Sequence, residues 1–298
     1  MKRRIVLSIA GLALAATGCG GADGDRAGSG SAIVGAFYPL AFAAERVGGD
    51  TTSVRNLTPP GVEPHDLELS ARDVRTVADA DLVLYLGQGF QPALEDALDS
   101  SDAPAVDLLE DLDLLAGAEE DHEEENHGDE EEARDPHVWL DPLRYAAIAE
   151  RIGEELDRPD PARDLSKELR ALDREFRNGL AECKRRELVT SHAAFGYLAE
   201  RYDLEQVALS GLAPEAEPTP RELEDVVEKV REQGATTVFF ETLVSPRLAE
   251  TIAREVGART ATLNPLEGLT PEEIADEADY FSVMRANLAT LREALECR

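Results

Sequence analysis

The chain contains five histidines, and their placement indicates a metal site. His65 lies in PGVEPHDLELS, His137 lies in DPHVWLDP, and His192 ends the apolar run ELVTSH. The other two, His122 and His127, lie in the acidic segment EEDHEEENHGDEEE. Imidazole is the commonest protein ligand for zinc. Histidines that are this scarce and placed in this way predict a protein that handles a metal ion.

A carboxylate, Glu267 in NPLEGLT, completes the candidate ligand set with His65, His137 and His192. Three neutral imidazoles and one carboxylate suit a four-coordinate zinc ion with bonds of about 2.0–2.2 Å. Manganese prefers more oxygen ligands, so the set favours Zn²⁺ and leaves Mn²⁺ or Fe²⁺ as alternatives. Each residue alone could be a hydrogen-bonded loop residue. The joint placement of all four favours metal binding.

Short β-rich runs alternate with amphipathic helical runs in two blocks, residues 32–160 and residues 184–298. Strands separated by helices of about ten residues indicate a mainly parallel sheet. We therefore predict an α/β fold of two lobes, each with a mainly parallel sheet flanked by helices. Residues 161–183 between them predict a long, rigid connecting helix. Its apolar stripe has spacings of three and four: Leu165, Leu169, Leu172, Phe176 and Leu180.

The candidate ligands occupy the positions where open α/β sheets bind ligands, beyond the carboxyl ends of the strands. His192 ends a predicted strand, while His65 and Glu267 each follow one through a loop. His137 precedes a predicted helix that begins at Pro142. Two candidates come from each lobe, so the sequence predicts a metal site in the cleft between the lobes.

Residues 1–18 have the order of a secretory signal peptide: a positive start, an apolar run, and small residues before Cys19. An apolar run of about 12 residues is too short to span a bilayer. We predict a lipoprotein that is lipidated at Cys19 and anchored outside the cytoplasmic membrane, with a soluble secreted protein as the alternative. Residues 19–31 are predicted to be a flexible tether.

The other two cysteines, Cys183 and Cys297, form an even pair in an exported chain. One precedes a predicted strand and the other ends the last predicted helix. We predict that they form a disulfide that closes the second lobe. Two unpaired thiols are the alternative, and metal ligation is disfavoured because neither cysteine is near a histidine motif.

The formal net charge of −32 argues against nucleic acid and anionic lipid as partners. Residues 119–132 hold ten carboxylates and two histidines but no large apolar residue. Such a segment cannot bury enough apolar surface to fold, so we expect a mobile loop.

Five motifs in this order resemble the metal-binding subunits of bacterial ABC importers for zinc and manganese, the cluster A-I or ZnuA-like solute-binding proteins. The resemblance covers about Ala32 to Cys297. It rests on PGVEPHDLELS, DPHVWLDP, TSHAAFGYLAERYDL, PEAEPTPRELEDV and NPLEGLT, followed by the helical run DYFSVMRANLATL.

The resemblance implies a receptor, not an enzyme, with one metal ion held by His65, His137, His192 and Glu267. It implies a high-affinity zinc receptor that delivers its ion to a permease with a cytoplasmic ATPase. Zinc-type members carry an acidic, His-rich loop before the second metal histidine, which makes His122 and His127 a weaker metal-collecting set. We expect a monomer. A zinc-dependent hydrolase and a surface adhesin remain as rival functions.

Overall fold

The computed structural model describes residues 31–117, 133–214 and 219–298. The predicted signal peptide, the lipidation residue Cys19 and nearly all of the predicted tether lie outside the described residues. The acidic segment with His122 and His127 also lies outside them. Among the helices of the described ranges, none is both long and apolar enough to cross a membrane.

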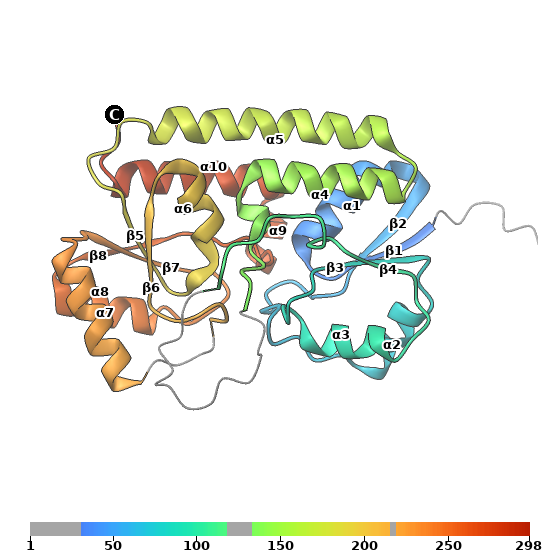
Figure 1. Cartoon of the computed structure of the whole chain (residues 1–298), viewed down its shortest axis with the longest axis horizontal. Helices are drawn as coiled ribbons and strands as arrows, with labels where there is room; N and C mark the ends of the chain where they lie inside the picture. Colours follow the sequence, from blue (N-terminus) through green and yellow to red (C-terminus); the bar gives the residue numbers. More distant parts are fainter. Residues whose placement is uncertain (1–30, 118–132, 215–218) are drawn as a thin grey trace, which may run out of the picture.

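The first lobe is built on a sheet of four parallel strands in the order β2-β1-β3-β4. Helices α1 and α4 lie on one side of this sheet, and α2 and α3 lie on the other (Figure 1). The strands are β1 (Ser31–Gly35), β2 (Thr52–Asn56), β3 (Leu82–Tyr85) and β4 (Ala105–Asp107). The helices are α1 (Tyr38–Gly48), α2 (Ala71–Ala78), α3 (Pro92–Asp99) and α4 (Pro142–Glu155).

The second lobe repeats this topology, with parallel strands in the order β6-β5-β7-β8. Helices α6 and α10 lie on one side of its sheet, and α7 and α8 lie on the other (Figure 1). The predicted fold class of two parallel-sheet lobes is confirmed. The strands are β5 (Glu187–Thr190), β6 (Glu205–Ala208), β7 (Thr237–Phe240) and β8 (Arg259–Thr262). The helices are α6 (Gly196–Tyr202), α7 (Pro220–Glu232), α8 (Arg247–Val256), the short α9 (Pro271–Ala275) and α10 (Tyr280–Ala294).

A single helix, α5 (Pro159–Leu180), runs along both lobes (Figure 1). Its 22 residues give a length of about 33 Å. All five members of the apolar stripe seen in the sequence are at most 1% exposed. This stripe packs against α4 of the first lobe and α10 of the second. The helix begins at Pro159, two residues before the expected start, because proline suits the first helical turn. It ends at Leu180, three residues before the expected end.

One hydrophobic core runs from the first lobe through α5 and α10 to one face of the second sheet. The two faces of the second sheet pack in different hydrophobic clusters. Neighbouring residues of β5 show this, because successive side chains of a strand point to opposite faces of the sheet. Leu188 belongs to the long core, while Val189 packs on the other face in a smaller cluster with residues of α7 and α8. The second sheet is therefore buried on both faces, as parallel sheets usually are.

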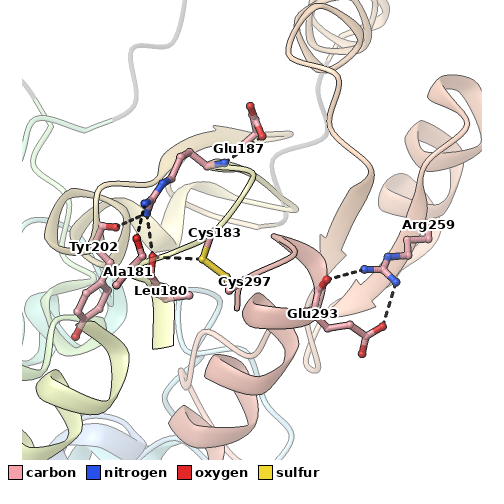
Figure 2. Close-up of a disulfide and its surroundings, with 9 residues drawn as sticks. Leu180, Ala181, Cys183, Glu187, Tyr202, Arg259, Glu293 and Cys297 are labelled. Carbon is pink, nitrogen blue, oxygen red and sulfur yellow. Dashed lines mark hydrogen bonds and ion pairs between the residues drawn. A yellow bond between two sulfur atoms is a disulfide. The ribbon is translucent and has the colours of Figure 1, made fainter. Parts of the chain in front are cut away.

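Cys183 and Cys297 form a disulfide at the start of the second lobe, which confirms the predicted pairing (Figure 2). Backbone hydrogen bonds hold the same two chain segments together. The amides of Lys184 and Arg185 donate to the Leu295 carbonyl, and the Arg298 amide donates to the Glu182 carbonyl. The disulfide thus joins segments that are already held together by backbone hydrogen bonds.

Arg186, three residues after Cys183, ties the ends of two helices together. Its guanidinium donates to the carbonyls of Leu180 and Ala181 at the end of α5, and to the carbonyl of Tyr202 at the end of α6. The last carbonyls of a helix have no partner within the helix, and a cation there also suits the helix dipole. One side chain therefore fixes the end of the connecting helix to the second lobe.

Candidate metal centre

The four predicted ligands come together from four different loops. His65 lies between β2 and α2, and His192 lies two residues after β5. Glu267 lies between β8 and α9. His137 immediately precedes a 3₁₀ turn, Val138–Leu140, that leads into α4. Three of the four ligands therefore follow the carboxyl ends of parallel strands, and two come from each lobe.

The geometry is centred on one oxygen atom of Glu267. Glu267 Oε1 lies 3.1 Å from His192 Nε2, 3.3 Å from His137 Nε2 and 3.6 Å from His65 Nε2. One ligand atom from each residue lies within 4.8 Å of those of the other three. His137, His192 and Glu267 are completely buried, and the His65 side chain is 8% exposed. Four donor atoms thus face one another in a nearly closed space.

These distances match the edges of a zinc coordination tetrahedron. Bonds of about 2.0–2.1 Å to a tetrahedral zinc ion place neighbouring ligand atoms about 3.3–3.4 Å apart. The three measured separations, 3.1 to 3.6 Å, bracket this value. Within the described chain, the buried Nε2 atoms of His65 and His137 have no hydrogen-bond partner. A buried polar atom normally has a partner, so both atoms are free to bind a metal ion.

Two buried carboxylates orient two of the imidazoles. Asp135 Oδ1 lies 2.7 Å from His137 Nδ1, and Glu241 Oε1 lies 2.7 Å from His192 Nδ1. Each carboxylate also accepts a hydrogen bond from the backbone amide of the same histidine. A carboxylate on Nδ1 fixes the ring and leaves Nε2 for the metal, which is the usual support of a zinc-binding histidine.

Burial and the neighbouring charges shift the pKa values of all four candidate ligands. Burial alone would lower the pKa of His192, but Glu241 and Glu267 raise it well above its usual value. The pKa of His137 is also raised, because Asp135 and Glu267 outweigh the effect of burial. Burial lowers the pKa of His65. Burial would raise the pKa of Glu267, yet His192 and the other imidazoles hold it well below its usual value.

The sequence prediction missed three buried carboxyl groups around the ligands. Asp135 and Glu241 are the orienting carboxylates, and Glu63 is the third. Burial, together with the charge of Glu267, raises the pKa of Glu63 to about 9, so its carboxyl group is neutral near pH 7. Their positions were the available signal in the sequence. Asp135 lies two residues before His137, and Glu241 directly follows β7, at the edge of the sheet where ligands collect.

The Glu267 loop is held by side-chain amides. Asn264 Oδ1 accepts a hydrogen bond from the Leu266 amide, and Asn287 on α10 bonds to both backbone groups of Asn264. Leu266 is fully buried and has a φ of 58°, which lies in the left-handed region that side chains other than glycine disfavour. A capping box formed by Thr270 and Glu273 then starts α9. The loop has a defined shape set by its own hydrogen bonds.

The chain is similar to several known proteins. The model of the ZnuA family, described as zinc-uptake complex component A periplasmic, matches residues 33–294. The zinc-binding lipoprotein AdcA of Streptococcus pneumoniae serotype 4 (strain ATCC BAA-334 / TIGR4) is 38% identical over 278 residues. That match covers 89% of this chain and 56% of the relative, so the chain spans about half the length of this relative.

Two solved structures have the same fold. The Zn(II)-bound ZnuA-like domain of Streptococcus pneumoniae AdcA matches with a TM-score of 0.74 at 34% identity, covering 90% of this chain and 100% of that domain. The laminin-binding protein Lmb of Streptococcus agalactiae, described as a bifunctional protein with adhesin and metal transporting activity, matches with a TM-score of 0.76 at 30% identity. It covers 89% of this chain and 100% of that chain. From its sequence match and its fold, the chain belongs to the ZnuA family.

Proposed function

We propose that the protein is the high-affinity zinc receptor of an ABC metal importer. It binds one Zn²⁺ between its lobes through His65, His137, His192 and Glu267, and delivers the ion to a permease that works with a cytoplasmic ATPase. It acts as a monomer outside the cytoplasmic membrane, anchored through a lipid on Cys19. In this proposal residues 32–160 and 184–298 are the two lobes, and residues 161–183 connect them.

One observation carries the proposal: a single Glu267 oxygen lies 3.1 to 3.6 Å from three imidazole nitrogens. Three nitrogen donors and one carboxylate favour zinc over manganese, which prefers a site richer in oxygen. Manganese or iron as the carried ion is the alternative within the same family. The name of the AdcA relative and the zinc bound in its ZnuA-like domain also support zinc.

The donor set favours a receptor over a hydrolase. A catalytic zinc site keeps a coordination position open for the water molecule that it activates. Here four protein ligands would fill a tetrahedral site. We therefore propose that the centre stores and releases its ion without catalysing a reaction.

The acidic segment 119–132, outside the described residues, has a secondary role in this proposal. Its ten carboxylates and two histidines, His122 and His127, would collect cations near the cleft. Ordering such a segment around an ion costs conformational entropy, so its binding would be weak. High salt would screen the attraction of this segment for cations.

Zinc affinity is expected to fall as the pH is lowered. The ligands bind zinc only in their deprotonated forms. Because the nearby carboxylates raise the pKa values of His137 and His192, protons compete with zinc for both imidazoles at a higher pH than they would for an ordinary histidine. We expect a loss of affinity of at least about tenfold between about pH 7.5 and about pH 5.5. Calorimetry in buffers with different ionisation enthalpies measures both the affinity and the number of protons released. An affinity that is constant over this range would contradict the three-histidine site.

Replacing Glu241 by glutamine is expected to weaken zinc binding by about tenfold or more. The amide keeps the size of the side chain but removes the charge that holds the His192 ring. A competition titration against a zinc-sensitive dye measures the change. Glu250→Gln removes the same charge from an exposed position on α8 and is the matched control. Equal affinities for the two variants would show that the Glu241 carboxylate does not support the site.

Adhesion is a second candidate function, favoured by the 30% identity to Lmb over the whole of that chain. Binding of the purified protein to immobilised laminin, with and without a zinc chelator, tests it. Laminin binding that persists after zinc removal would support an adhesive role that does not depend on the metal centre. No binding above that of an unrelated acidic protein would exclude this role.

A further inference from the structure

A hydrogen bond joins the two ligand loops across the lobes. The indole Nε1 of Trp139, two residues after His137, donates to the carbonyl oxygen of Pro265 over 2.8 Å. Pro265 lies two residues before Glu267. The bond is buried, and it links a residue of the first lobe to one of the second. It is therefore placed to set the position of Glu267 relative to His137.

Trp139 is itself held in place. Its side chain is completely buried and packs against Phe37 and Phe90 of the first lobe, with ring centroids 4.8 and 5.5 Å away. Its backbone carbonyl accepts a hydrogen bond from the Tyr280 hydroxyl on α10. Its ring centroid lies 5.2 Å from that of His137. The indole N–H is thus a fixed donor on the first lobe.

The acceptor side of this bond needs such support. Leu266, between Pro265 and Glu267, has the left-handed backbone that residues with side chains disfavour. Asn264 and Asn287 hold one end of the loop. Trp139 holds the other side of the turn through the Pro265 carbonyl. Without the indole donor, that carbonyl would lie at the lobe junction with no partner among the described residues. The backbone hydrogen bond from the Gly61 amide to the Leu269 carbonyl also joins this loop to the first lobe, but it lies on the far side of Glu267 from the turn at Leu266.

We propose that Trp139 is a positioning residue for metal capture, whose indole N–H holds the turn at Leu266 so that Glu267 faces the three imidazoles. The inference rests on the proposed zinc site and deepens it. Trp139 does not touch the ion; it couples the ligand loop of His137 to that of Glu267. Outer groups that support metal ligands typically contribute about 10- to 100-fold to metal affinity.

The test compares Trp139→Phe with Tyr145→Phe. Tyr145 provides a matched control, since its hydroxyl also donates from a buried aromatic side chain to a proline carbonyl, that of Pro39. Both variants lose one buried hydrogen bond and some stability. We expect zinc affinity to fall about 10- to 100-fold in Trp139→Phe and less than about threefold in Tyr145→Phe. The visible spectrum of bound cobalt(II), which reports coordination geometry, should change only in Trp139→Phe.

Wild-type affinity and an unchanged cobalt spectrum in Trp139→Phe would overturn the proposal. An equal loss of affinity in both variants would also overturn it, because the effect would then follow stability. Trp139 is the only tryptophan in the chain, so one indole N–H signal is expected in the NMR spectrum of the unaltered protein. Slow hydrogen exchange of this signal with zinc bound is expected, and exchange at the rate of a free indole would exclude the bond. If the unaltered protein binds no zinc, the proposed function fails, whatever Trp139 does.

Discussion

Replacing His192 by alanine is expected to lower the affinity for zinc by about two to three orders of magnitude. Structural zinc sites with four protein ligands bind with about 10–16 kcal/mol, so one ligand accounts for about 2.5–4 kcal/mol, or about two to three factors of ten in affinity. His192 is completely buried, and its Nε2 atom is the imidazole nitrogen nearest to Glu267 Oε1, at 3.1 Å. A competition titration with a chelator of known zinc affinity measures the loss.

Deleting residues 119–132 is the complementary control. The deletion removes ten carboxylates and two histidines but none of the four proposed ligands. We expect one tightly bound zinc ion to remain in the deletion variant, because the deleted segment contains none of the four proposed ligands. Either of two results would assign the tight site to the acidic segment. One is tight zinc binding that survives the loss of His192, and the other is tight binding that disappears when residues 119–132 are deleted.

Removing the disulfide by the double change Cys183→Ser and Cys297→Ser is expected to lower the free energy of unfolding by about 4 kcal/mol. The two cysteines are 114 residues apart, so the disulfide closes a long loop in the unfolded chain and strongly restricts its freedom. The folded state should change little, since backbone hydrogen bonds between residues 182–185 and 295–298 hold the same segments together. Urea unfolding of both proteins measures the difference.

The zinc affinity of the double-serine protein provides a control. The disulfide precedes β5, whereas His192 follows its carboxyl end, so the two features lie at opposite ends of that strand. Affinity should stay within about threefold of the unaltered protein, well below the effect of losing a ligand. A stability loss below about 0.5 kcal/mol would mean that the unfolded chain gains little freedom without the disulfide.

Much of the fold could be predicted from the sequence because the signals are repeated along the chain. Each strand and helix contributes a periodic pattern, and the apolar stripe of α5 extends over several turns. The positions of His65, His192 and Glu267 after predicted strands indicated the edge of the sheet where ligands collect. These predictions rest on local patterns that tertiary contacts reinforce.

The support of the ligands could not be predicted in the same way. Asp135 and Glu241 are two among 62 acidic residues, and only the folded chain places them against His137 and His192. The sequence also cannot tell a tryptophan that only fills the core from one, such as Trp139, that also donates a hydrogen bond to the other lobe. The left-handed backbone conformation of Leu266 could not be predicted either, because leucine rarely adopts it.

The long core has a consequence for how the protein unfolds. Because the core continues from the first lobe through α5 and α10 into the second sheet, most of both lobes should melt as one cooperative unit. The layer formed by α7 and α8 packs on a separate, smaller cluster and can open locally at a lower free energy. Trp139 and Leu266, which lie beside the candidate ligands, pack in the larger cluster. We therefore expect opening of the outer layer to disturb the ion-binding geometry less than unfolding of the larger unit would.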